Sequence, residues 1–297
     1  MRLTLFLLSI TAWSQSATPP IVEVRSPLGK TFYGQADEKG AAAKAEALLT
    51  GPETVDNLLA AARVYDELWW FSKSIPVYTR GIKKFPTEFR FPRFRGHRYI
   101  STRRFGLAVK DLQKARQLAP DSFDVAYHLG LAHYLQGHFG KAADAYGRCL
   151  ALAGKPAPGT ALPAGLRGCH ELEKQDNSRV AITEWAYRSL RRAGRNAEAA
   201  KLLAAVTEGL TVGTNATYYQ TLLYYKGLRQ ESAILPTSGA IQGNIYSTAG
   251  YGIANFHWLE GRKARACEIL NAIVSERAWN AFGFIAAETD LVRGACR

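Results

Sequence analysis

The side chains best suited to binding chemistry in this chain are basic residues gathered in one short window. Between Arg80 and Arg116 stand twelve Lys and Arg residues, opposed only by Glu88 and Asp111. Guanidinium groups bind carboxylates and phosphates through paired hydrogen bonds, and like charges three or four residues apart on a helix repel one another. This density of basic residues predicts contact with an anionic partner. The competing interpretation is that the basic residues lie on solvated helix faces and bind nothing. We expect Arg95 to turn inward to an acidic or carbonyl partner.

The histidines and carboxylates form no catalytic or metal-binding pattern. His128, His133 and His138 recur every five residues, about 140° apart around a helix, so they do not share one face. No Gly-x-Ser-x-Gly motif occurs. Neighbouring carboxylates are expected on solvated helix faces: Glu171 with Glu173, and Glu288 with Asp290. We therefore predict a non-enzymatic protein without metal or cofactor.

The four cysteines are Cys149, Cys169, Cys267 and Cys296. They include no C-x-x-C pair, so their spacing matches no zinc signature. In an oxidising compartment they can form two disulfides, with three connectivities open. The pairing that closes the shortest loops is Cys149–Cys169 with Cys267–Cys296. The alternative is that Cys149 and Cys267 are small buried packing residues of helices.

Residues 1–14 have the features of a cleaved secretory signal peptide. Arg2 supplies a positive end, Leu3–Ile10 form a short apolar run, and Ala12 with Ser14 offers a small-x-small cleavage site. We therefore expect an extracytoplasmic protein, periplasmic or secreted, with no integral membrane segment after cleavage and no nucleic acid as partner. The net charge of +13 favours an acidic protein or peptide, acidic polysaccharide or lipid headgroups as partners.

Three stretches of the chain align on one another at a constant offset of 34 residues. The aligned positions are Phe71, Phe105 and Phe139; Tyr78, Leu112 and Tyr146; and Ser74, Ala108 and Ala142. Pro86 and Pro120 end the first two units. A fixed period of 34 residues is typical of helix–turn–helix units stacked into a solenoid, so we predict an all-α fold.

These units resemble the tetratricopeptide repeat. The third unit fits best, with framework residues Leu129, Gly130, Tyr134, Gly137, Phe139, Ala142 and Tyr146. The first unit departs from the family at Trp69, where a turn glycine is usual. The resemblance implies a right-handed α-α superhelix with capping helices, which binds proteins along its concave face.

The chain divides into segments by composition and period. Residues 15–54 are expected to hold an extended segment and a capping helix, 55–153 three repeats, 154–179 a Gly/Pro-rich insertion, and 180–297 divergent repeats. A helix over 216–228 and a closing helix over 279–293 are also expected.

The resemblance also implies which side chains line the concave groove. Carried onto this sequence, they are Arg63, Arg90, Arg93, His97, Tyr127, Leu131 and Tyr134. The basic members would hold an acidic or C-terminal peptide segment, although Asp124 stands where the next repeat should add a cation. Two alternatives remain: binding of a non-protein polyanion, and an enzyme with a site in the 154–168 or 229–243 loop.

Overall fold

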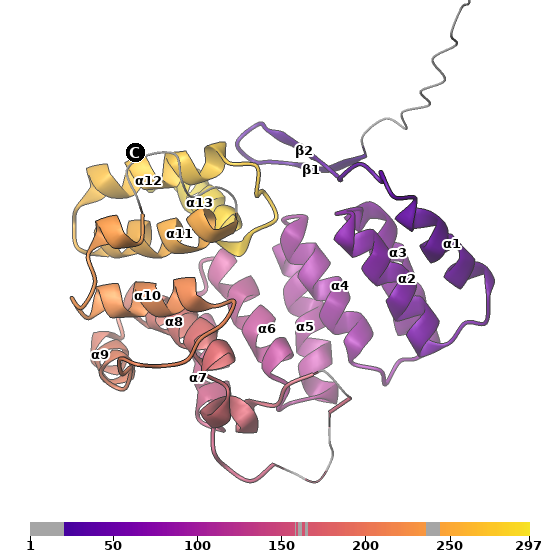
Figure 1. The fold of residues 1–297 in the computed structure, drawn as a ribbon, viewed down its shortest axis with the longest axis horizontal. Coiled ribbons are helices and arrows are strands. Elements are labelled where there is room, and N and C mark those ends of the chain that lie inside the picture. The colour runs from indigo at the N-terminus through magenta and orange to yellow at the C-terminus, as the bar shows by residue number, and fades with distance from the viewer. Residues whose placement is uncertain (1–20, 158, 160–161, 164–165, 236–243) are drawn as a thin grey trace, which may run out of the picture.

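The computed structural model describes residues 21–157, 159, 162–163, 166–235 and 244–297, the side chains of 244 and 245 excepted. Over these residues the fold is almost entirely helical, and most helices pack against their neighbours in sequence (Figure 1). The prediction of an all-α solenoid-like fold is confirmed. The expected signal peptide lies outside the described residues.

Three helix pairs form the first half of the solenoid. They are α2 (Val55–Glu67) with α3 (Phe71–Lys84), α4 (Arg90–Ser101) with α5 (Phe105–Leu118), and α6 (Phe123–Leu135) with α7 (Phe139–Leu150), preceded by α1 (Ala41–Thr50). The second helix of each pair begins at Phe71, Phe105 or Phe139, so the period seen in the sequence is a structural period. Glycine allows the helices of a pair to approach closely, since a Cβ on Gly130 would lie 2.4 Å from the Tyr146 ring.

The second half turns back toward the first. Its elements are η1 (Cys169–Lys174), α8 (Asp176–Arg192), α9 (Asn196–Ala204), α10 (Ala216–Tyr225), η2 (Glu231–Ala233), α11 (Asn244–Leu259), α12 (Lys263–Ser275) and α13 (Phe282–Val292). The expected helices over 216–228 and 279–293 form as α10 and α13, both shorter than predicted. Helix α8 begins at Asp176, inside the segment expected to be an irregular insertion.

A β-hairpin near the N-terminus joins the two halves. Strands β1 (Val22–Arg25) and β2 (Thr31–Tyr33) pair antiparallel, whereas the sequence indicated only an extended segment here. Phe32 stacks on Trp279 with ring centroids 5.5 Å apart, and Glu23 accepts hydrogen bonds from the Ser72 N–H and hydroxyl (2.7 and 2.8 Å). Figure 1 shows the hairpin reaching from the first repeat toward α12 and α13.

The turns inside the three repeats share one unusual backbone conformation. Trp69, Arg103 and Gly137 occupy equivalent turn positions with φ of +57°, +61° and +80°. This left-handed conformation costs a non-glycine residue roughly 1–2 kcal/mol, so Trp69 and Arg103 need compensating contacts.

Those compensating contacts all come from the C-terminal segment. They are Trp69 with Trp279 (5.6 Å between centroids) and Arg103 with Glu288 (2.7 Å). Gly137 needs no compensation, but it lies beside the guanidinium of Arg293 from the same segment. The C-terminal segment therefore packs across the turn ends of all three repeats, and the repeats do not form an open-ended array.

The expectation that Glu288 and Asp290 lie on a solvated helix face is wrong. Glu288 is 1% exposed and accepts hydrogen bonds from the Arg103 Nε (2.7 Å) and the Ser26 hydroxyl (2.5 Å). Asp290 is also buried and accepts from the Arg192 guanidinium at 3.1 Å. These partners lie far away in sequence, so a local pattern on the helix carries no sign of them.

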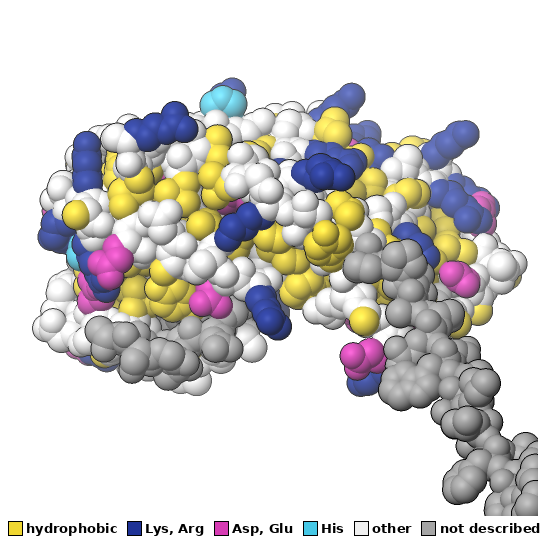
Figure 2. Space-filling model, turned by 90° about the horizontal axis from the view of Figure 1, so that it is seen from above, with side chains coloured by type: hydrophobic (Ala, Val, Ile, Leu, Met, Phe, Trp, Pro, Cys, Tyr) yellow, Lys and Arg dark blue, Asp and Glu magenta, His cyan; other side chains and the backbone are white. Residues whose placement is uncertain are grey.

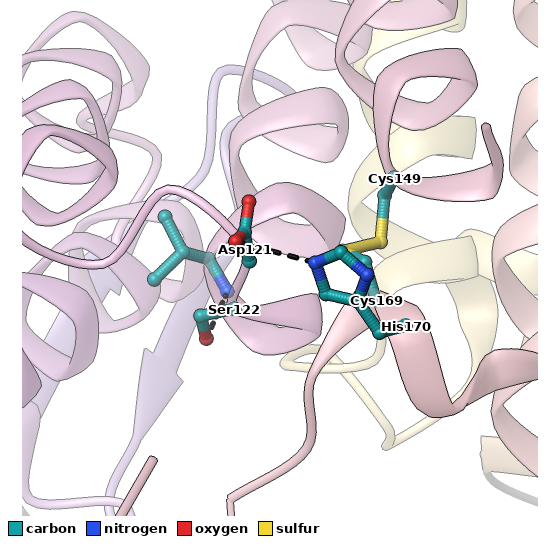
Figure 3. The surroundings of a disulfide bond; sticks show 6 residues. Asp121, Ser122, Cys149, Cys169 and His170 are labelled. Carbon is teal, nitrogen blue, oxygen red and sulfur yellow. Dashed lines mark hydrogen bonds and ion pairs between the residues drawn. A yellow bond between two sulfur atoms is a disulfide. The ribbon is translucent and has the colours of Figure 1, made fainter. Parts of the chain in front are cut away.

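Both disulfides of the short-loop pairing are present, Cys149–Cys169 and Cys267–Cys296. The first ties α7 to η1, where the glycine-rich segment returns to the start of α6 (Figure 3). The Asp121 carbonyl accepts from the Cys169 N–H (2.8 Å), and the His170 Nε2 lies 3.3 Å from the Asp121 carboxylate. The segment after α7 is therefore fixed at its end by a covalent bond and by the polar contacts around it.

Removal of the Cys149–Cys169 disulfide is expected to destabilise the protein by about 3 kcal/mol, because the unfolded chain regains the entropy of an open loop of this length. Urea unfolding of Cys149→Ala/Cys169→Ala, compared with the parent chain, measures this difference. An unchanged urea midpoint would contradict the disulfide.

Replacing Arg103 with Ala is expected to cost about 3–5 kcal/mol of unfolding free energy, because the buried Glu288 carboxylate then lacks a countercharge. Urea unfolding of Arg103→Ala, Glu288→Ala and the double variant forms a double-mutant cycle. We expect the double variant to be more stable than the sum of the single effects implies. Strict additivity would show that the two groups do not interact.

Candidate functional site

The structure does not place the implied groove residues along one open trough. Arg63 is exposed and lies over the Phe94 ring (5.2 Å), whereas Arg90 pairs with the Glu88 carboxylate at 2.8 Å. Arg93 is 8% exposed, and its guanidinium lies 2.9 Å from the Asp124 carboxylate. Asp124 stands where the resemblance implies a further cation, and in the structure its carboxylate neutralises the implied groove residue Arg93 from within the protein.

The expectation that Leu131 and Tyr134 line an accessible groove is wrong. Both are fully buried, and the Tyr134 hydroxyl lies 2.7 Å from that of Tyr251 on α11. The ring of Trp185 on α8 packs edge-on against Tyr134, with centroids 5.2 Å apart. The second half of the chain folds onto the concave face at this point and replaces the expected ligand contacts with core packing.

Most of the basic window is also neutralised from within. Seven of its twelve cations lie within 4 Å of a carboxylate: Arg80, Lys84, Arg90, Arg93, Arg95, Arg98 and Arg103. The Arg95 partner is Asp111, at 2.6 Å, so the prediction that Arg95 turns inward is confirmed. On the face seen from above, Lys and Arg side chains are dispersed and do not gather into one basic trough (Figure 2).

A pocket of about 300 Å³ remains where the two halves of the molecule face each other. We call it the concave pocket. Its lining residues are His97 of α4, Thr214, Asn215, Thr217 and Tyr218 around the start of α10, Thr248 of α11, and Asn280, Ala281 and Phe282 at the start of α13. Only His97 among them was implied by the sequence. The volume is at the lower end of the range usual for small-ligand pockets.

The lining of the concave pocket is polar without being charged. Hydroxyl groups of threonine, the side-chain amide of Asn280 and the rings of Tyr218 and Phe282 are presented side by side. The first turns of α10 and α13 both lie at the pocket, and a helix N-terminus carries partial positive charge. At the start of α10, the Ala216 and Tyr218 N–H groups already donate to the carbonyls of Gly213 and Asn215. This arrangement suits a small anionic group that accepts hydrogen bonds.

His97 is half-buried at the pocket and stands beside a buried histidine, His128. The His97 and His128 ring centroids are 4.4 Å apart, and the Phe282 ring lies 5.3 Å from His97. Burial, reinforced by the charges of Arg98, His128 and Arg93, lowers the pKa of His97 well below its usual range. His97 is therefore neutral near pH 7, and its side chain has no hydrogen-bond partner among the described residues.

Tyr127 connects the third repeat to the pocket wall. It is buried, its hydroxyl lies 3.1 Å from that of Tyr218, and its ring lies 6.2 Å from Phe282. The structure thus brings His97 and Tyr127 together with α10 and α13, which lie outside the three regular repeats. One sign of this part of the site is visible in the sequence, a predicted helix over 216–228 that the 34-residue period does not explain.

Comparison with known proteins gives no relative: no protein-family model matches the chain, and no curated protein matches it. The tetratricopeptide resemblance therefore stays a prediction. Among the described residues, no three His, Cys, Asp or Glu side chains are grouped to hold a metal ion. No helix in that part of the chain is long and apolar enough to cross a membrane.

Half-buried His97 and buried His128 predict a pH-dependent stability. Burial, reinforced by Arg93, also lowers the pKa of His128 well below its usual range. Because the unfolded chain takes up protons first as the pH falls below about 6.5, the unfolding free energy should fall over that range. We expect a shallower dependence in His97→Gln and His128→Gln, measured by urea unfolding between neutral and mildly acidic pH. The same change at exposed His138 is the matched control, and equal slopes in all variants would contradict the burial argument.

Proposed function

We propose that this protein is a non-enzymatic binding scaffold that captures an acidic or C-terminal peptide segment of another protein in the concave pocket. The class of partner is the one that the sequence indicates. The binding site differs, because it is the neutral concave pocket and not a basic groove. We also propose that it acts outside the cytoplasm, which the expected signal peptide and the two disulfides support.

The observation that carries the proposal is the meeting of His97 with the first turns of α10 and α13 at one pocket. A carboxylate accepts hydrogen bonds from neutral donors and from helix N-termini, and it needs no lysine or arginine if several donors converge. The neutral imidazole of His97 and the Asn280 amide are such donors. A pocket of about 300 Å³ has room for one terminal residue of a peptide, not for a folded partner.

The lining favours a peptide over the two alternatives. Tyr218 and Phe282 offer apolar ring surface beside the polar groups, which suits a side chain next to a carboxylate. A polyanion would need several cations at the site, and the lining has no Lys or Arg. The same lining favours a single terminal carboxylate over a run of acidic side chains. The lining also has no carboxylate and no thiol, so it lacks the usual partners for His97 in acid–base or nucleophilic catalysis.

The test uses short random-sequence peptides in two forms, with a free C-terminal carboxylate or with a C-terminal amide. We expect the immobilised full chain to retain the carboxylate form selectively. For a retained peptide, His97→Ala/Asn280→Ala should weaken binding by about 10- to 100-fold, because hydrogen bonds to a charged group are lost. Fluorescence polarisation with the labelled peptide measures the dissociation constant.

The matched control is His138→Ala/Asn271→Ala, which removes one histidine and one asparagine from exposed positions outside the pocket. Circular dichroism checks that both variants keep the helical fold. Equal retention of the amide and carboxylate peptides, or equal loss in both double variants, would refute carboxylate capture in this pocket.

A further inference from the structure

A second charged surface lies on the outer helices of the second and third repeats. We call it the basic face and define it by five cations: Lys110, Lys114 and Arg116 of α5, and Lys141 and Arg148 of α7. All are exposed except Arg116, which is half-buried. None of the five has a carboxylate partner among the described residues. These five residues contribute to the positive charge that no ion pair in the described part of the chain neutralises.

The acidic residues of the same two helices do not neutralise these cations. Asp111 is buried against Arg95, with a distance of 2.6 Å between the charged groups. Asp144 lies 2.6 Å from the Arg195 guanidinium, toward α9. The basic face therefore presents its charge to solvent without a local counterion from α5 or α7.

Two of the five cations of the basic face lie at one cleft. Arg116 and Arg148 flank the same shallow cleft between α5 and α7, above Ala126 and Leu129 of α6. His133 of α6 is buried near them, and its Nδ1 has no hydrogen-bond partner among the described residues.

The pKa of His133 is lowered by burial and by cations of the basic face. Burial lowers this pKa to about 4, and the charges of Lys141, His138 and Arg116 add to the effect. Two of these neighbours, Lys141 and Arg116, belong to the basic face, so His133 lies within reach of its charges.

The shape of the basic face limits which kinds of anionic partner could bind to it. The cleft between Arg116 and Arg148 measures about 10 Å³, no more than one water molecule needs, so no groove holds a linear chain. The exposed positions of α5 and α7 carry no aromatic ring on which a base could stack, although Leu107 is 47% exposed. Three of the five cations are lysines, which act as flexible point charges without paired hydrogen-bond geometry.

We propose that the basic face adsorbs this protein to a membrane surface rich in anionic phospholipid. Adsorption to such a surface needs no groove and no fixed hydrogen-bond pattern, only several cations presented together. The basic face and the concave pocket share no residues. Membrane adsorption and peptide capture are therefore independent proposals, and refuting one does not refute the other.

The test measures co-sedimentation of the full chain with vesicles of phosphatidylglycerol mixed with phosphatidylcholine, and with pure phosphatidylcholine vesicles. We expect binding to the anionic vesicles alone, and its loss as salt is raised to about 0.5 M because the charges are screened. The variant Lys110→Gln/Lys114→Gln/Lys141→Gln should bind about a hundredfold more weakly, at the usual contribution of a basic residue near an anionic membrane.

The matched control is Lys39→Gln/Lys44→Gln/Lys263→Gln, which removes the same charge from exposed lysines elsewhere and should bind as the parent chain does. Both variants keep residues 1–20, so any contribution of that segment cancels. Equal weakening in the two variants would show that only total charge matters and would overturn the proposal. Binding to heparin or duplex DNA without binding to anionic vesicles would overturn it in favour of another polyanion.

Discussion

The fold depends on one buried carboxylate that joins three distant segments of the chain. Glu288 of α13 accepts from Arg103 in the turn of the second repeat and from Ser26 beside the hairpin. A charge at 1% exposure is tolerated only when it is paired and hydrogen-bonded, so the three segments must be in place together. The same contact compensates the left-handed backbone of Arg103. Where an open solenoid would leave its turns in water, this chain uses them to bind its own C-terminal helix.

This closure explains why the concave face holds a pocket and no trough. Once α13 packs across the repeat turns, α8 and α11 cover Tyr134 and Leu131, and the space left over lies around His97. The cations that would have lined a trough must then be neutralised internally, as Arg93 is by Asp124. The position and the polarity of the concave pocket therefore follow from the same long-range contact.

The sequence predicted the features whose causes are local. The starts of α3, α5 and α7 follow from Phe71, Phe105 and Phe139, since each aromatic recurs at the same place in a unit, and Arg95 finds Asp111 on the next helix of its own repeat. The burial of Glu288 depends on segments some 180 to 260 residues away, those of Arg103 and Ser26. The packing of the hairpin on Trp279 and most of the pocket lining likewise depend on segments more than 100 residues apart. No period or motif encodes such contacts, because each is made once and by a single residue.

The neutral pocket and the basic exterior of the molecule have one physical origin. With a net charge of +13, this chain cannot keep unpaired cations inside, since burying a lone charge costs more free energy than folding supplies. Cations that enter the interior take a carboxylate with them, and the surplus remains on outer helices such as α5 and α7. In the proposed function, recognition inside the molecule is left to neutral hydrogen-bond donors and helix ends, which are short-ranged and selective. The outer charge acts over a Debye length of about 10 Å and is sensitive to salt. Short-range selection and long-range attraction are thereby assigned to different surfaces of one chain.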